Sequence, residues 1–395
     1  MILSYFLRKL NDILNINKDD PLRFVEMTTM DLGKFTLLKA LLYAGLSYNI
    51  LFFLIQIAYF AVNFELKQFI QFFSLNVGAL HGYLASWTVL RYEKDSIEMI
   101  NYKQKHFIKL SQISASSYTR ILKSVTPRRY FFLLNLLAMH FLFLFFWPIF
   151  GYEDDYYFPV YFLNEYVRPL FGRYIAFSLR IFFYITTYTY VTSAWIQVHI
   201  STYFLSQMEF QLIVVEDYIR DLGKLPISEE RIHSSVVDEH LKVCIRHYFH
   251  VLEFMDKMKG WIFWPMMAAT VGSLVMLLSY IYFILVQASL EAFPRVVSLF
   301  LSVAFSIVLY SMCGQGLVDQ CGRVNSALYF LPWYKYSKKN CELLRLFMVT
   351  TSKPLFLNLL GFLEVDALLV MQVYKFVVSS LAAVQQIVAL RKRDD

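Results

Sequence analysis

Charged residues are scarce in this sequence. Only 17% of the 395 residues are Asp, Glu, Lys or Arg, whereas 58% are hydrophobic and the mean hydropathy is +0.48. A soluble domain carries about 25% charged residues, so this chain has too few of them to cover a water-soluble particle. The shortage excludes a disordered chain and an ordinary soluble enzyme, and it favours a protein that crosses a membrane several times.

Glycine and cysteine are scarce as well. The 13 glycines and the long apolar runs argue against a transmembrane β-barrel, in which short strands alternate polar and apolar residues. A disulfide-stapled secreted domain is also excluded. The four cysteines lie in or beside segments that we expect to face the cytoplasm, so we interpret them as reduced thiols: Cys244, Cys313, Cys321 and Cys341.

The motifs of common catalytic sites are missing. The sequence has no glycine-rich phosphate loop, no His-Glu-x-x-His and no Gly-x-Ser-x-Gly. His81 and His140 lie in apolar segments without a second ligand at metal spacing, so we interpret both as hydrogen-bonded core residues. The first six apolar segments also lack the paired charges and repeats of a secondary transporter. We therefore expect no enzyme, no metal and no cofactor.

Long apolar segments are what the sequence does contain. Six of them are free of charge and reach the roughly 20 residues that a helix needs to cross a membrane: 40–64, 68–90, 130–152, 181–208, 260–290 and 296–318. A seventh candidate, residues 354–390, is interrupted by Glu364, Asp366 and Lys375. Charges inside a membrane helix usually face protein or water, so we expect this helix to differ from the six lipid-spanning segments in its surroundings. We predict an all-α polytopic membrane protein with seven transmembrane helices.

The distribution of Lys and Arg predicts the orientation. Both are abundant in the N-terminal segment and in the connections after the second, fourth and sixth helices. The alternate connections are sparse in positive charge, with Lys67, Arg168 and Arg295 as examples. Since positive loops stay in the cytoplasm, we expect a cytoplasmic N-terminus and an extracellular C-terminus. The basic residues 391–393 contradict this rule, and an even number of crossings would remove that exception.

Two charged segments have helical periodicity. Residues 92–118 and 238–258 mix charged and apolar positions at helical spacing, without the alternation of strands. We therefore expect helices two, four and five to continue beyond the lipid into the cytoplasm. Such extensions fit either subunit assembly or a monomeric helical surface.

Aromatic residues make up 18% of the chain and gather at the outer ends of helices two to six. They predict an apolar pocket open to the extracellular half, in which one or two polar groups would orient a small neutral ligand. His140, Tyr184 and Ser302 are candidates for those polar groups. The alternative interpretation is that the aromatic side chains face lipid or pack between helices.

The last helix has a pattern of its own. Helical spacing places Val377, Leu381 and Gln385 on one stripe. Val384 lies beside that stripe, and acidic residues precede the helix. An apolar ring forms a dewetting gate in some channels, and acidic groups at a pore entrance favour cations. The same pattern also fits a helix that simply faces lipid.

The C-terminal third carries a series of short motifs. They are Cys313-Gly-Gln-Gly-Leu, Ala327-Leu-Tyr329, Trp333-Tyr334, the segments 343–351 and 352–354, and Ser379-Ser380-Leu381-Ala382-Ala383-Val384-Gln385-Gln386. With a cytoplasmic N-terminus, seven spans and long inner extensions, these motifs make the chain resemble an insect odorant receptor. The resemblance is specific over about residues 313–386, and upstream it rests on topology and length.

The resemblance also indicates the type of subunit. In the superfamily of odorant and gustatory receptor channels, the last helix ends in Thr-Tyr, five apolar residues and Gln-Phe. Here Ser379 and Ser380 replace Thr-Tyr, and Ile387 replaces Phe. This departure is usual for divergent tuning receptors. The shared co-receptor also has a longer loop after helix four than residues 211–259 supply.

A function and a set of partners follow from the resemblance. It implies the odorant-binding subunit of a ligand-gated, non-selective cation channel, in which four subunits surround one pore. The implied partners are a small volatile odorant, co-receptor subunits in a tetramer and membrane lipid, with no nucleic acid. The implied location is the plasma membrane of an olfactory neuron dendrite.

The resemblance assigns roles to residues and segments. The ligand-binding residues would be Phe73, His140, Phe143, Trp147, Tyr184, Tyr188, Tyr280 and Ser302. The gate would include Val377, Leu381, Val384 and Gln385. The chain would divide into a cytoplasmic N-terminal segment (1–36), a six-helix ligand-binding region with cytoplasmic extensions (37–318), a cytoplasmic anchor (319–358), the pore-lining seventh helix (359–390) and an extracellular tail (391–395).

Two other receptor classes also have seven transmembrane helices. A gustatory receptor of the same superfamily would sense non-volatile ligands, and the altered terminal motif disfavours it. A G-protein-coupled receptor needs an extracellular N-terminus, which the charge distribution contradicts, and its Asp-Arg-Tyr and Asn-Pro-x-x-Tyr motifs are missing from the sequence.

Overall fold

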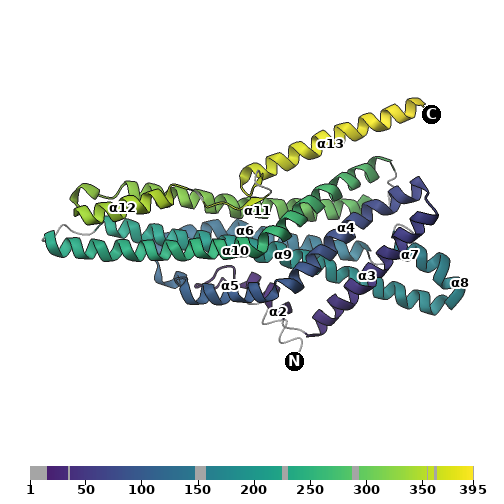
Figure 1. Cartoon of the computed structure of the whole chain (residues 1–395), viewed down its shortest axis with the longest axis horizontal. Coiled ribbons are helices and arrows are strands. Elements are labelled where there is room, and N and C mark those ends of the chain that lie inside the picture. Colours follow the sequence, from purple (N-terminus) through teal and green to yellow (C-terminus); the bar gives the residue numbers. More distant parts are fainter. Residues whose placement is uncertain are drawn as a thin grey trace.

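Long helices form almost the whole molecule (Figure 1). The computed structural model describes residues 16–33, 36–146, 157–224, 230–286, 293–353, 355–359 and 363–394. The strands within these ranges are Asn358–Leu359 (β1) and Leu363–Glu364 (β2), which pair antiparallel with Asn358 opposite Glu364. The structure therefore confirms the all-α class apart from this one short hairpin.

Seven of the described helices have 26 residues or more, and each overlaps one of the apolar segments. They are α3 (Thr36–Val62), α4 (Leu66–Arg91), α6 (Ala115–Phe146), α9 (Arg173–Gly223), α10 (Glu230–Val286), α11 (Phe293–Tyr329) and α13 (Ala367–Asp394). The described part of the chain also has five shorter helices: α2 (Arg23–Gly33), which precedes α3, and the connecting helices α5 (Glu93–His106), α7 (Phe158–Phe162), α8 (Arg168–Phe171) and α12 (Lys338–Thr351). Single turns are η1 (Leu110–Gln112), η3 (Leu163–Val167) and η4 (Trp333–Lys335).

Apolar length supports some of the predicted spans directly. Among the described residues, Lys39–Val62 in α3 and Phe300–Tyr329 in α11 are long and apolar enough to cross a membrane. Ala367–Ala383 in α13 is a shorter apolar helix. The seven-span count and the orientation of the termini stay predictions.

Two helices are far longer than a membrane requires. α9 has 51 residues and α10 has 57, so at 1.5 Å per residue each extends about 75–85 Å. A hydrocarbon core is about 30 Å thick, so both helices continue well beyond one. α4 behaves differently, because it ends at Arg91 and a new helix, α5, begins at Glu93. Glu93 and Asp95 lie in the first turn of α5, where carboxylates favour a helix start.

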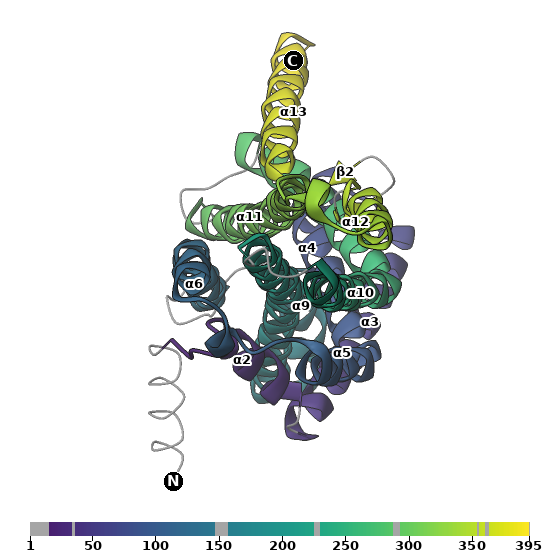
Figure 2. The ribbon, with the colours of Figure 1, turned by 90° about the vertical axis from the view of Figure 1, so that its left-hand side faces the viewer.

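The second half of α9 is the centre of the molecule. Figure 2 shows α9 with α2, α6, α10 and α11 around it. Every residue from Ser201 to Asp217 is buried, and the main hydrophobic core forms around this stretch. A helix that is buried on all sides lies in the core, so α9 is the central helix against which the others pack.

The last helix lies apart from this core. α13 packs against α10 and α11 near its start, through Leu369 and Val373, and then extends away from the bundle (Figure 1). Its other large apolar side chains are exposed, both around that contact and beyond it: Leu368, Val370, Met371, Tyr374, Val378 and Leu381. An apolar helix needs another surface to cover it, whether lipid or protein.

Candidate functional site

The predicted ligand-binding residues come from α4, α6, α9, α10 and α11, and the structure describes three of their side chains. Tyr184 is buried, Tyr188 is half-buried and Ser302 is buried. Four others have a described helical backbone but no described side chain: Phe73, His140, Phe143 and Tyr280. Trp147 lies outside the described residues. The proposed pocket as a whole therefore stays a prediction.

Tyr184 lies in an aromatic cluster between α9, α3 and α7. It packs with Phe183 and Val160, and its ring lies 6.0 Å from the guanidinium of Arg180. Tyr48 of α3 borders the cluster and donates a hydrogen bond of 3.1 Å to the carbonyl of Leu179. These contacts place Tyr184 against α3 and α7, two elements outside the predicted lining.

Ser302 lies in a different seam, between α6 and α11. Asn135 donates from Nδ2 to the Ser306 hydroxyl at 2.9 Å and to the Ser302 carbonyl at 3.2 Å. The Ser306 hydroxyl also donates to the Ser302 carbonyl at 2.9 Å. Buried polar groups cost free energy unless they are paired, so this small network fixes the contact between the two helices. No described contact joins Ser302 to Tyr184 directly.

The predicted gate residues share one stripe of α13. Val377 is half-buried, whereas Leu381 and Gln385 are exposed in the single chain. Val384 has a described backbone only. The stripe lies beyond Leu369 and Val373, the described α13 residues that pack on the main hydrophobic core.

Two glycines bring α11 against the segment that leads into α13. At Gly314 a methyl group would overlap the backbone carbonyl of Val365, and at Gly316 it would overlap the side chains of Arg128 and Glu209. Gln315 lies between them, and its Oε1 accepts a hydrogen bond from the Ala367 amide at 3.1 Å. A side chain larger than hydrogen cannot fit at either glycine without a shift. We call this contact between Gly314–Gly316 of α11 and Val365–Ala367 the α11–α13 joint.

Beneath the joint lies a buried ion pair between Arg128 of α6 and Glu209 of α9. Arg128 also donates to the Met312 carbonyl and the Ser206 hydroxyl, both at 3.3 Å, and Ser124 donates to Glu209 at 2.9 Å. Burial alone would lower the pKa of Arg128, but the Glu209 carboxylate outweighs burial and raises it. The Arg128 side chain therefore links α6, α9 and α11 close to Gly316.

Comparison with known proteins defines the family. A family model described as 7tm Odorant receptor matches residues 65–378, which is most of the chain. The chain belongs to the odorant receptor family. The receptor is therefore a multi-pass membrane protein, and its family is a class of receptors rather than of enzymes. No curated protein matches its sequence.

Solved structures of insect olfactory receptors have a similar fold. The structure of olfactory receptor OR5 from Machilis hrabei has a TM-score of 0.64 with the receptor at 11% identity, covering 89% of this chain and 88% of that one. The structure of the same protein in complex with eugenol has a TM-score of 0.63, also at 11% identity and with the same coverage. At this identity the likeness concerns the fold.

The receptor also contains a buried charged cluster that holds the N-terminal helix. Lys103 of α5 binds Glu26 of α2 at 2.7 Å and Asp20 at 3.0 Å. The Tyr203 hydroxyl donates to Glu26 at 2.7 Å and to Asp20 at 2.6 Å, and Gln207 donates to Asp20 at 2.8 Å. Burial alone would lower the pKa of Lys103, and the two carboxylates raise it. The cluster fastens α2 and α5 to α9.

Sequence reasoning missed these contacts. Arg128 and Lys103 counted only as positive charges of cytoplasmic connections, and Glu209 follows directly after an apolar segment. The one available signal was the Gly-Gln-Gly of residues 314–316, because two glycines within a helix predict a close approach of another backbone or side chain.

Proposed function

We propose that the receptor is the odorant-binding subunit of a ligand-gated, non-selective cation channel, and that it works with co-receptor subunits in a tetramer at the plasma membrane. The observation that carries the proposal is α13, a largely apolar helix that leaves its own core and stays exposed along most of its length. A tetramer would cover part of this surface by placing four copies of the helix around one pore, with lipid covering the rest.

The ligand would bind in the outer half of the membrane. Phe73, His140, Phe143, Trp147, Tyr184, Tyr188, Tyr280 and Ser302 are the residues proposed to line that site. The aromatic surroundings of Tyr184 and the small polar network at Ser302 support a ligand that is mainly apolar with one polar group. OR5 from Machilis hrabei, which has a similar fold, binds eugenol in one of its structures, and this supports a small volatile ligand.

The gate would be the α13 stripe of Val377, Leu381 and Gln385, with Val384 beside it. Ligand-induced movement of α11 would reach α13 through the joint at Gly314 and Gly316, because that joint brings the two segments into direct contact. The buried Arg128–Glu209 pair would transmit movement of α6 and α9 to the same place. Coupling of this kind needs elements that are packed together and have two arrangements.

Expression in a cell without its own odorant receptors tests the proposal. The receptor is expressed with a co-receptor and, in parallel, alone, and whole-cell current is recorded during exposure to a broad panel of volatiles. The proposal predicts odour-evoked cation current only with the co-receptor. Current from the receptor alone would favour the gustatory class, and silence with the co-receptor, despite surface expression of both chains, would contradict the proposal. An externally accessible N-terminal tag would contradict the orientation.

A further inference from the structure

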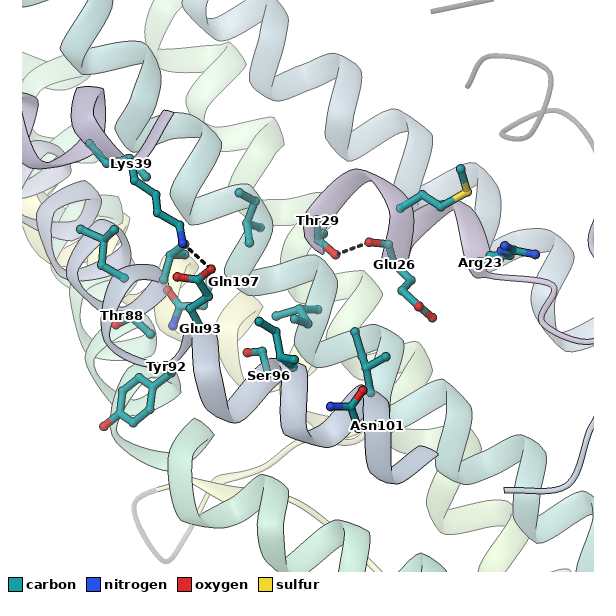
Figure 3. Close-up of a pocket in the computed structure, with 18 of the residues that line it drawn as sticks. Arg23, Glu26, Thr29, Lys39, Thr88, Tyr92, Glu93, Ser96, Asn101 and Gln197 are labelled. Atoms are coloured by element: carbon teal, nitrogen blue, oxygen red, sulfur yellow. Dashed lines mark hydrogen bonds and ion pairs between the residues drawn. The ribbon is translucent and has the colours of Figure 1, made fainter. Parts of the chain in front are cut away.

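A cavity of about 450 Å³ lies between α2, α3, α4, α5 and α9 (Figure 3). It is separate from the proposed odorant site, because Gln197 on its wall lies about 14 Å from Tyr188 and about 20 Å from Tyr184 along α9. Its volume is in the range of sites that hold small molecules. Neither the odorant site nor the α11–α13 joint uses its residues.

One part of the cavity is apolar. Its aliphatic walls come from four helices: Leu42 of α3, Val89 and Leu90 of α4, Ile97 and Ile100 of α5, and Ile196 and Ile200 of α9. Branched aliphatic side chains offer dispersion contacts to a hydrocarbon but no hydrogen bond. This part of the cavity fits an alkyl or ring portion of a ligand.

The other part has two largely buried polar side chains that line the cavity. Gln197 is 6% exposed and Ser96 is 7% exposed, and both line the cavity. Within the described part of the chain, neither the Gln197 amide nor the Ser96 hydroxyl forms a side-chain hydrogen bond. Neither group is among the fully buried unpaired atoms of the described residues, so both are accessible from the cavity, where a ligand group can pair with them. An amide and a hydroxyl together offer both donors and acceptors.

The charges around the cavity balance. Lys39 and Glu93 form an ion pair of 2.6 Å, and both are about one-third exposed (Figure 3). Arg23 and Glu26 supply one further charge of each sign, so the four charged side chains that line the cavity sum to zero. A ligand with a net charge would leave that charge without compensation in a mostly apolar site. The lining therefore favours a neutral ligand.

We propose that this cavity is a second ligand site of the receptor, and that it takes a neutral amphipathic molecule. A hydroxyl or carbonyl group of the ligand bonds to Gln197 and Ser96, and its hydrocarbon portion lies against the isoleucines of α5 and α9. Two kinds of molecule have this chemistry: a free alcohol and a hydroxyl-bearing neutral lipid of the bilayer. A ligand here contacts α2, α3, α4, α5 and α9 together, so it stabilises their arrangement.

Photolabelling of the full receptor tests the site. The probe is an eight-carbon alkanol that carries a photoreactive diazirine, and the labelled residues are located by mass spectrometry. We expect labels on α5 near Ile97 and Ile100 and on α9 near Ile196 and Ile200. Excess 1-octanol or 1-monooleoylglycerol should displace these labels, and which of them does so identifies the source. Octanoate, which is charged, should displace them poorly.

Two variants and a control keep the test specific. Gln197→Met keeps the side-chain size but removes the amide, and it should weaken labelling about three- to tenfold, the value of one or two neutral hydrogen bonds. Ile100→Trp fills the cavity and should abolish labelling. Gln112→Met makes the same exchange as the first variant at an exposed position and should change nothing. All variants are compared as monodisperse protein.

Three results would overturn the proposal. The first is labelling of α5 and α9 that Gln197→Met leaves unchanged, the second is an absence of label from both helices, and the third is displacement by octanoate as strong as by octanol. Because Gln197→Met is nearly isosteric, it decides the matter even if Ile100→Trp does not fold. None of these readouts needs a current, so failure of the channel proposal would not imitate failure of this one.

Discussion

Arg128 of α6 and Glu209 of α9 form a buried ion pair directly under Gly316 of α11. A methyl group at Gly316 would overlap both side chains, so the glycine and the pair depend on each other. The neighbouring Gly314 touches the carbonyl of Val365, two residues before α13 begins. One compact contact thus joins three helices of the bundle to the proposed pore helix.

Breaking the Arg128–Glu209 pair should destabilise the receptor strongly. Glu209→Gln leaves a buried guanidinium without its carboxylate, and the loss of one partner in such a pair costs about 3–5 kcal/mol. The double variant Arg128→Met/Glu209→Met leaves no uncompensated charge and should lose less than the single variant. Thermal unfolding of purified protein measures both. Asp221→Asn removes a carboxylate from an exposed pair with Lys224 and should leave the melting temperature unchanged.

Alanine at Gly314 or Gly316 should impair gating. Gly314→Ala and Gly316→Ala should move the segment before α13 and reduce odour-evoked current, because the methyl group meets a backbone or a buried ion pair. Gly322→Ala is the control on the same helix, where no atom lies within 4 Å of the added carbon. It should assemble and conduct normally, and its stability should rise slightly with the better helix former. Equal currents from all three variants at equal surface expression would contradict the role of the joint.

Acidification should destabilise the receptor through His247. His247 donates from Nε2 to Gln211 at 2.9 Å, and burial lowers its pKa to about 4, with a smaller contribution from His250. The unfolded chain takes up this proton near pH 6.5, so the stabilisation is complete above that pH and is lost progressively as the pH falls towards 4. The free energy of unfolding should therefore fall by up to about 3 kcal/mol over that window.

His247→Gln should flatten that pH dependence. Melting temperatures of wild type and variant at pH 7.5 and pH 5 provide the measurement. His240→Gln, at an exposed position of the same helix, should keep the wild-type slope. The same slope in wild type and His247→Gln would assign the pH dependence to other groups.

Leu381→Ala should alter the basal conductance or the ion selectivity of the assembled channel, because it removes an apolar side chain from the proposed dewetting ring. Ser379→Ala changes a residue on the opposite face of α13 and should leave both properties unchanged. Reversal potentials and basal currents of cells that also express the co-receptor provide the measurement. Wild-type values for Leu381→Ala would move the gate to other residues.

The sequence was informative where a pattern is local. Charge-free apolar length located six of the seven long helices that the structure describes, because such a stretch depends only on neighbouring residues. Helical periodicity predicted the continuation of α9 and α10 past the apolar segments. The break at Tyr92 between α4 and α5 was missed, since both sides of it have helical periodicity. The β1–β2 hairpin was missed because two residues per strand carry no readable alternation.

Contacts between distant segments could not be predicted. Nothing in the sequence near Arg128 or Glu209 indicates that the two residues pair, because the pairing depends on how α6, α9 and α11 pack. The cavity at Gln197 and Ser96 is a gap among five helices and has no sequence motif. The last helix could be distinguished from the sequence, because Glu364, Asp366 and Lys375 interrupt its apolar segment.

Accessibility of α13 tests the channel account most directly. Leu381→Cys is expressed with the co-receptor, and a membrane-impermeant cationic methanethiosulfonate is applied during odour-evoked current. Wild type is a suitable background because three of its cysteines are buried and Cys341 is half-buried. If α13 lines the pore, Leu381→Cys should lose its current irreversibly, whereas Ser379→Cys and wild type should keep theirs. Equal modification at both positions, or an unmodified Leu381→Cys current, would contradict the account.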